Sequence, residues 1–72
     1  MDLSVVIPTY NERERLAELI HTITSTFRSA GIRGEVIVVD DNSPDGTGEV
    51  ANQLAQQDDN VKVIHRPGKL GL

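Results

Sequence analysis

Cysteine and tryptophan are absent from the 72 residues of this chain, and aromatic residues make up only 3% of it. Without cysteine the chain can form neither a disulfide framework nor a cysteine-based zinc site. The few aromatic side chains offer no set of stacking platforms for single-stranded nucleic acid. The formal net charge of −4 also argues against binding a nucleic-acid backbone, which requires clustered lysine and arginine. We therefore expect no nucleic-acid partner.

Long apolar runs are also missing, and no segment approaches the roughly 20 apolar residues that a membrane-spanning helix needs. Residues 1–4 lack the basic beginning and the long apolar run of a secretory signal peptide. These absences predict a cytoplasmic location. A chain of 72 residues holds one domain at most, and a domain of this size buries only about 60% of the surface of its unfolded chain.

Periodic apolar segments of two kinds alternate along the chain. Short runs rich in β-branched residues predict strands at about 3–7, 35–40 and 61–64. Apolar residues at helical spacing predict helices at about 12–29 and 47–57. The resulting β-α-β-α-β order predicts the α/β class, with parallel strands joined by right-handed crossovers.

The ends of these elements carry their own signals. Pro8 has no N–H for a sheet ladder, so the first strand is expected to end there. Asn11 is a good N-cap residue for the first helix, and Glu14 three positions later resembles a capping box. Gly31 and Gly34 are expected to close that helix. The apolar stripe of the first helix consists of Leu16, Leu19, Ile20, Ile23 and Phe27.

The predicted sheet lacks cover. A parallel sheet needs both faces covered, and three strands with two helices cannot easily provide that. They also leave the edges of the sheet open, which allows self-association. We therefore expect the chain to be the first, truncated part of a larger three-layer α/β sandwich.

Acidic side chains follow the second predicted strand. Asp40 and Asp41 come directly after the buried run 36–39, and Asp45 lies in the turn beyond them. Two adjacent carboxylates repel each other unless a ligand, a cation or N–H donors offset their charge. The alternative is an ordinary turn, because Asp, Asn, Ser, Pro and Gly are common turn and cap residues. From this loop alone the two interpretations weigh equally.

The loop after the first strand allows a similar choice. Tyr10 could stack on a base, and Glu12 could accept hydrogen bonds from a base or a ribose. From this loop alone an ordinary strand end and helix start is the commoner explanation, with Pro8 ending a strand, Asn11 capping a helix and Glu12 at the positive end of the helix dipole. Since the carboxyl ends of parallel strands meet at one edge of the sheet, the two loops are expected to converge there, where α/β sheets bind ligands.

The remaining polar candidates are weaker. His21 lies off the apolar stripe and is expected on the surface. His65 has no second His or Cys at ligand spacing, which argues against a metal site. Arg66 and Lys69 could meet a phosphate, although a solvated turn is the commoner explanation. No G-x-G-x-x-G follows the first strand, and no G-x-x-x-x-G-K-[ST] occurs.

Two stretches are similar to a known family. Residues 5–12, V-V-I-P-T-Y-N-E, and residues 38–47, V-V-D-D-N-S-P-D-G-T, resemble the two opening motifs of family 2 glycosyltransferases with the GT-A fold. The patterns P-T-Y-N-E-R-E and D-D-x-S-P-D-G-T look most like the dolichyl-phosphate mannosyltransferase branch. Residues 61–72 resemble the next strand of that branch and its G-L-containing loop. Two motifs at the right separation are far more specific than either alone.

The resemblance implies that residues 1–72 form the N-terminal, nucleotide-binding part of a single GT-A domain, which is Rossmann-like and incomplete here. In this picture Asp40 supports its loop and Asp45 caps the second helix. The residues that the resemblance places against the nucleotide-sugar are Pro8, Tyr10, Glu12, Val39 and Asp41.

The branch also implies a reaction, the inverting transfer of mannose from GDP-mannose to a dolichyl or other polyprenyl phosphate. The complete enzyme is expected to need Mg²⁺ or Mn²⁺, held by a D-x-D motif beyond Leu72, where the catalytic residues are expected too. We therefore expect no metal ligand in this chain and no activity from it alone. The parent enzyme is expected in the cytoplasm, with membrane association on the cytoplasmic face as a further option.

Two other interpretations stay open. A receiver-like domain also has an Mg²⁺-binding acidic cluster at its strand ends, but its acidic pair follows the first strand, and here the pair follows the second. It also needs a phosphoacceptor Asp after the third strand, where this chain has His65, Arg66 and Pro67. The third possibility is a non-catalytic remnant that assembles with another chain through an open sheet edge.

Overall fold

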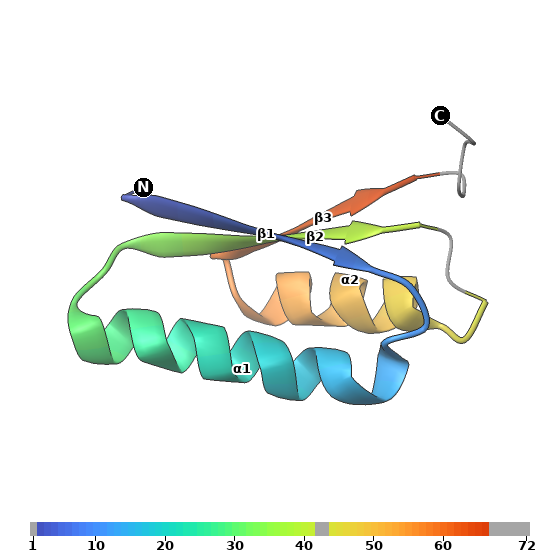
Figure 1. Cartoon of the computed structure of the whole chain (residues 1–72), viewed down its shortest axis with the longest axis horizontal. Helices are drawn as coiled ribbons and strands as arrows, with labels where there is room; N and C mark the ends of the chain where they lie inside the picture. The colour runs from blue at the N-terminus through green and yellow to red at the C-terminus, as the bar shows by residue number, and fades with distance from the viewer. Residues whose placement is uncertain (1, 42–43, 67–72) are drawn as a thin grey trace.

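Three strands and two helices alternate along the chain in the predicted order. The computed structural model describes residues 2–41 and 44–66. All three strands are parallel, which confirms the predicted α/β class. The elements, drawn in Figure 1, are β1 (Leu3–Thr9), α1 (Arg13–Ala30), β2 (Gly34–Asp40), α2 (Thr47–Gln57) and β3 (Val61–His65).

The sheet has the order β1-β2-β3, with β2 in the centre. Figure 1 shows both helices on the same face of this sheet, as expected when two right-handed crossovers step across a sheet in one direction. The described residues therefore supply two layers of the expected three-layer sandwich. In this sheet β1 and β3 are edge strands, and self-association through them stays a prediction.

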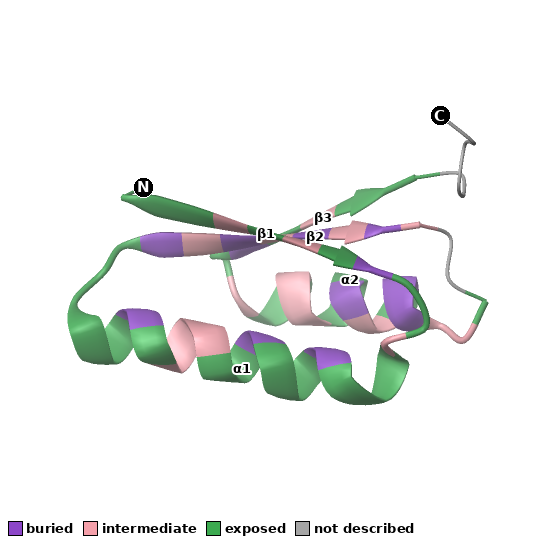
Figure 2. Ribbon diagram, viewed as in Figure 1, coloured by how far each residue is buried: buried purple, intermediate pink, exposed green. Residues whose placement is uncertain are grey.

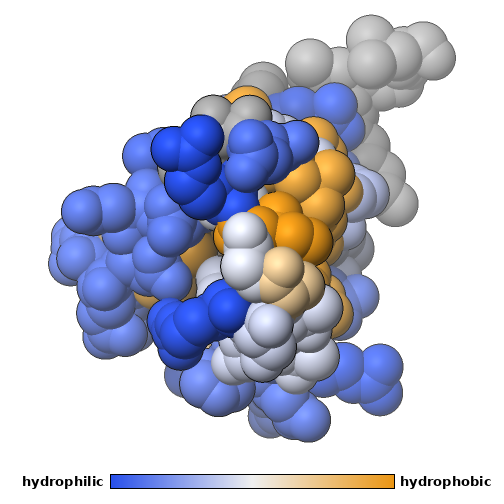
Figure 3. Space-filling view, turned by 90° about the vertical axis from the view of Figure 1, so that its left-hand side faces the viewer, coloured by the Kyte–Doolittle hydropathy of each residue, from blue (hydrophilic) through white to orange (hydrophobic). Residues whose placement is uncertain are grey.

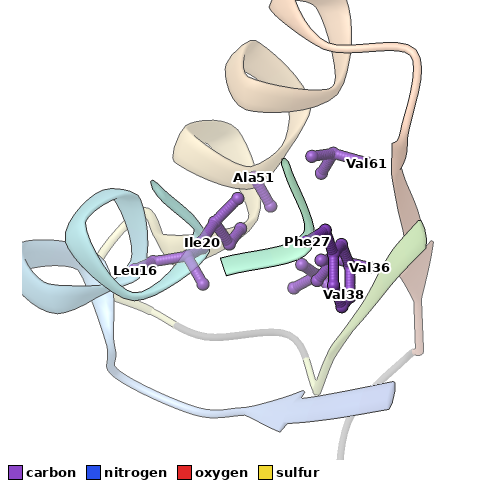
Figure 4. Packing of buried hydrophobic residues seen from close by; sticks show 7 residues of the cluster. All are labelled: Leu16, Ile20, Phe27, Val36, Val38, Ala51 and Val61. Carbon is purple, nitrogen blue, oxygen red and sulfur yellow. The ribbon is translucent and has the colours of Figure 1, made fainter. Parts of the chain in front are cut away.

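Burial alternates along β2 and marks the face that the helices cover. The buried positions of β2 are Gly34, Val36, Val38 and Asp40, and the residues between them are half-buried. Figure 2 shows buried residues on β2 and on the sides of the helices that face it. The core joins both helices to β2 and β3 (Figure 4). It consists of Leu16, Ile20, Phe27, Val36, Val38, Ala51 and Val61.

The opposite face of the sheet is more open. Val6 and Ile64 are exposed there, beside the half-buried Ile37 and Val39. Among the described residues no helix covers this face (Figure 1). Figure 3 views the molecule from the end opposite to the loop after β2. In this view hydrophobic residues lie together on one side of the molecule, and hydrophilic residues cover much of the remaining surface.

The first strand runs further than expected. β1 includes Pro8 and ends at Thr9, so the prediction that it stops at Pro8 is wrong. The N–H of Asp41 donates to the carbonyl of Thr9 at 3.3 Å, and successive residues of a strand direct their backbone groups to opposite sides. The Pro8 nitrogen therefore faces away from β2, where a missing N–H costs the β1–β2 ladder no hydrogen bond.

The start of α1 also differs from the prediction. Glu12 occupies the N-cap position, and no side-chain hydrogen bond is made by the cap residue. The predicted capping by Asn11, with its capping box to Glu14, is therefore wrong. Asn11 instead has a φ of 55°, in the left-handed region that asparagine tolerates better than most residues.

The far end of α1 follows the prediction in part. Gly31 closes the helix in the left-handed conformation, with a φ of 68°, as expected. Gly34 instead begins β2, and a Cβ added there would lie 2.5 Å from the ring of Phe27. Glycine at this position lets the last turn of α1 pack closely on the sheet. In the predicted stripe, Ile23 is half-buried and Leu19 is exposed, so the prediction was wrong for Leu19.

Leu16→Ala is expected to lower the free energy of unfolding by about 2–5 kcal/mol, because Leu16 is 0% exposed and its loss leaves a cavity between α1 and the sheet. Leu19→Ala is the matched control on the same helix. Leu19 is 43% exposed, so its loss should cost no more than about 1 kcal/mol. Urea unfolding followed by circular dichroism measures the free energy of unfolding of both variants. An equal decrease in the two variants would contradict the observed packing.

Candidate functional site

The loops that follow β1 and β2 lie side by side at the carboxyl edge of the sheet. The Glu12 N–H donates to the hydroxyl of Thr47 at 2.9 Å. The Arg13 N–H donates to Asp45 Oδ2 at 3.2 Å, and the Arg13 guanidinium donates to the Asp45 carbonyl at 3.5 Å. These hydrogen bonds join the start of α1 to the second loop, and they confirm the predicted convergence.

Asp45 and Thr47 form the junction between the loops. Thr47 is completely buried and begins α2. Its N–H donates to Asp45 Oδ1 at 3.0 Å, and its hydroxyl donates to the same oxygen. The Asp45 carboxylate thus accepts backbone N–H groups from the first residues of both helices. Gly46, with a φ of 91°, holds the N-cap position of α2, so Asp45 caps this helix from one residue further out.

The hydrogen bonds at this junction lower the pKa of Asp45. The largest contribution is the hydrogen bond from the Thr47 hydroxyl. Burial raises the pKa, and the backbone N–H groups of Arg13 and Thr47 lower it further. The ionised carboxylate also lies at the positive ends of two helix dipoles. Asp45 is therefore charged at neutral pH and holds the two helix starts together.

Asp40 and Asp41 each face a basic side chain at the end of β3. Asp40 is opposite His65 in the ladder, so Asp41 lies beside Arg66. His65 Nδ1 is 3.7 Å from Asp40 Oδ2, and Arg66 Nε donates to Asp41 Oδ1 at 2.5 Å. The hydrogen bond and the charge of Asp41 raise the pKa of Arg66. The positive charge of Arg66 thus offsets part of the repulsion between the two carboxylates from within the chain.

The two carboxylates point to different environments. Asp40 is 4% exposed and lies on the helix side of the sheet. A Cβ added to Gly48 would lie 2.6 Å from Asp40 Oδ2, so glycine makes room for this carboxylate under the first turn of α2. His65 Nε2 lies 2.8 Å from Asn52 Oδ1 and ties β3 to α2. The Asp41 side chain, 14% exposed, belongs to the uncovered face.

Two of the residues predicted to contact a nucleotide-sugar share a row on the uncovered face. Pro8 is opposite Val39 in the sheet, and Val39 is opposite Ile64. Tyr10 is exposed in the loop beside this row, and the half-buried Glu12 is held there by its hydrogen bond to the second loop. An apolar row bordered by polar side chains suits a base and its N–H groups. Contact of these residues with a nucleotide stays a prediction.

Some features of this edge were not identified from the sequence. Ile64 extends the apolar row, and Arg66, which was considered as a phosphate contact, lies against Asp41 in this structure. The positions of both residues follow from the alignment of β2 with β3, which pairs residue 40 with residue 65. An alignment of the two predicted strands could therefore have identified them. Lys69 lies outside the described residues. A polar hollow between the two loops is lined by Asn11, Glu12, Arg13, Glu14, Arg15, Pro44 and Asp45.

Metal-binding groups do not gather at this edge. Within residues 2–41 and 44–66, no three or more His, Cys, Asp or Glu side chains are arranged to hold a metal ion. The acidic groups instead accept hydrogen bonds from N–H, hydroxyl and guanidinium donors, so the described residues alone do not fit a metal centre. In the same ranges neither helix has the length and apolar character needed to cross a bilayer.

The sequence pattern of Glycosyl transferase family 2 matches residues 4–72. This match covers nearly the whole chain and includes both loops of the site. The chain therefore belongs to glycosyltransferase family 2, which confirms the resemblance of its two motifs. Family membership also favours a transferase over a receiver-like module.

Two curated relatives place the chain more closely. It is 49% identical over 72 residues to the dolichol-phosphate mannosyltransferase of Pyrococcus furiosus, covering 100% of this chain and 20% of the relative. It is 48% identical over 69 residues to the polyprenol monophosphomannose synthase of Mycolicibacterium smegmatis, covering 94% of this chain and 24% of the relative. The chain thus spans only about a fifth to a quarter of the length of these proteins.

A solved structure supports the fold. The mannosyltransferase PcManGT from Pyrobaculum calidifontis, in complex with GDP-Man and Mn²⁺, matches with a TM-score of 0.76 and 27% identity. The match covers 99% of this chain and 21% of that protein. The predicted GT-A architecture is thereby confirmed for the part of the fold that this chain represents.

Asp45→Asn is expected to change how stability depends on pH. Because folding lowers the pKa of Asp45, the carboxylate stabilises the fold above its unfolded pKa of about 3.9. That contribution is lost as the pH falls through the lower folded value. The difference in unfolding free energy between wild type and Asp45→Asn should therefore be largest near neutral pH and should narrow below about pH 4.

Urea unfolding at a series of pH values measures this difference. Asp59→Asn, in the exposed turn before β3, is the control and should show no such narrowing. A difference between wild type and Asp45→Asn that stays constant across the acid range would contradict the role of the Asp45 charge.

Proposed function

We propose that this chain is the nucleotide-sugar-binding part of a mannosyltransferase that transfers mannose from GDP-mannose to a dolichyl or other polyprenyl phosphate. The observation that carries the proposal is the convergence of both family motifs at one edge of the sheet, joined by the Glu12–Thr47 and Arg13–Asp45 hydrogen bonds. The similarity to two mannosyl-lipid enzymes along the chain supports the choice of donor and acceptor.

The base lies against the uncovered face of the sheet. Pro8 and Val39 offer it an apolar surface, and Asp41 at the end of the same face accepts its N–H groups. Guanine carries a ring N–H next to an amino group, and a carboxylate can accept from two such neighbouring donors at once. Arg66 orients the Asp41 carboxylate through its hydrogen bond to Oδ1.

The loop after β1 contacts the ribose side of the nucleotide. Tyr10 is exposed and packs against the base or the ribose. Glu12 accepts hydrogen bonds from ribose hydroxyls, and its own backbone N–H is already held by Thr47. These two residues and Asp41 approach the nucleotide from different strands, as is usual at the carboxyl edge of an α/β sheet.

The transfer step needs groups beyond this part of the fold. A bound Mg²⁺ or Mn²⁺ would offset the charge of the leaving diphosphate, and the solved mannosyltransferase holds Mn²⁺ with GDP-Man. Since the described residues do not form a metal centre, the ligands of that ion would come from other parts of the polypeptide. We propose that residues 1–72 are the start of a single GT-A domain, inactive alone, in an enzyme located in the cytoplasm or on the cytoplasmic face of a membrane.

Asp41→Asn is expected to weaken GDP binding to the full-length product of this gene. The substitution replaces the charged carboxylate that accepts the base N–H groups with a neutral amide. Hydrogen bonds to charged groups contribute about 1.5–3 kcal/mol. The dissociation constant should therefore rise by about ten- to a hundredfold. Isothermal titration calorimetry with GDP measures it.

Asp59→Asn removes an aspartate charge away from the site and should leave the affinity unchanged. Titration with UDP tests the base, because uracil lacks the paired donors of guanine, and UDP should bind more weakly than GDP. A wild-type protein that binds neither nucleotide would rule out the proposed pocket. Equal affinities for the two would rule out the assignment of guanine.

A further inference from the structure

Two side chains outside the proposed nucleotide contacts join the two loops that carry those contacts. Thr47 Oγ1 accepts the Glu12 N–H at 2.9 Å, and Asp45 Oδ2 accepts the Arg13 N–H at 3.2 Å. Asp45 Oδ1 accepts both the N–H and the hydroxyl of Thr47. A continuous chain of hydrogen bonds therefore runs from the start of α1 to the start of α2.

We propose that Asp45 and Thr47 are positioning residues for nucleotide binding. They hold the loop of Tyr10 and Glu12 against the end of β2, where Asp41 lies, and they act through Glu12 and not through a nucleotide contact of their own. This inference rests on the proposed function, and it adds to it two residues that set the affinity of the site.

The loop between β1 and α1 is too short to move independently of the helix. Tyr10 and Asn11 alone separate the end of β1 at Thr9 from the N-cap residue Glu12. Asn11 is already in the left-handed region, with a φ of 55°. The Glu12 carbonyl accepts the N–H of Leu16 at 2.9 Å, so Glu12 also moves with the first turn of α1. The place of Tyr10 therefore depends on the bonds that hold Glu12.

Burial makes the Thr47 hydroxyl hard to replace. Thr47 is 0% exposed, so removal of its hydroxyl leaves the Glu12 N–H without that acceptor at a place where water has little access. An amide left without a partner costs more than the hydrogen bond itself contributed. The first turn of α1 would shift to find another acceptor, and Tyr10 and Glu12 would shift with it.

The Asp45 carboxylate strengthens the same junction. It accepts from Arg13 in the first turn of α1 and from Thr47 in the first turn of α2, 32 and 2 residues away in the sequence. A negative charge at two helix N-termini is favourable at both. One side chain thus links the orientation of the two helices at the edge where the nucleotide would bind.

The test compares dissociation constants for GDP, measured by calorimetry on the full-length gene product. Thr47→Val keeps the shape of the side chain and removes the hydroxyl, and the dissociation constant should rise about tenfold. Thr47→Ser restores the hydroxyl and should return the constant to near its wild-type value. Thr26→Val makes the same change at an exposed position of α1 and should leave binding unchanged.

Thermal unfolding of each variant separates affinity from stability, with binding measured below the lowest midpoint. If Thr47→Val lowers the midpoint yet binds GDP as tightly as wild type, Thr47 is a structural cap only and the proposal is overturned. If Thr47→Val does not fold, Asp45→Asn replaces it: weaker binding supports the proposal and unchanged binding overturns it. A wild-type protein that binds no GDP instead overturns the proposed function itself.

Discussion

The parallel pairing of β2 with its two neighbours is the constraint on which the rest of the structure depends. The last residue of β2, Asp40, is opposite Thr9 of β1 and His65 of β3. Three points far apart in the sequence are thereby brought to one edge. Each loop begins from a place that the ladder determines. The loops meet because the strands end together, and their hydrogen bonds then hold them in contact.

The alternation of side chains at the end of β2 gives different surroundings to Asp40, the last residue of the strand, and to Asp41, the residue after it. Asp40 turns toward the helices, where His65 and the space left by Gly48 accommodate it. Asp41 turns toward the uncovered face and meets Arg66. Two neighbouring acids that would repel each other in an isolated loop therefore lie in different surroundings, Asp40 beneath the first turn of α2 and Asp41 beside Arg66. The separation follows from the alternation of side chains along a strand and needs no special loop conformation.

Element types, the α/β class and the convergence of the two loops could be predicted from the sequence, because they depend on local periodicity and on how parallel strands end. The length of β1 could not, since the effect of Pro8 depends on which side of the strand its nitrogen faces. Asn11 is the better local cap for α1, but Asp45 and Thr47, more than 30 residues away, bind the first N–H groups of that helix. The partner of Asp41 likewise depends on strand register.

In the proposed site, the Asp45 carboxylate would also restrict how a nucleotide is oriented. Many nucleotide-binding folds direct phosphates at a helix N-terminus, where free N–H groups and the helix dipole attract anions. Here the Asp45 carboxylate accepts N–H groups at the starts of α1 and α2, and it adds a negative charge at both helix starts. A diphosphate would be repelled from both helix axes. The nucleotide would then lie across the strand ends, with its phosphates directed away from these helices toward positive charge supplied elsewhere.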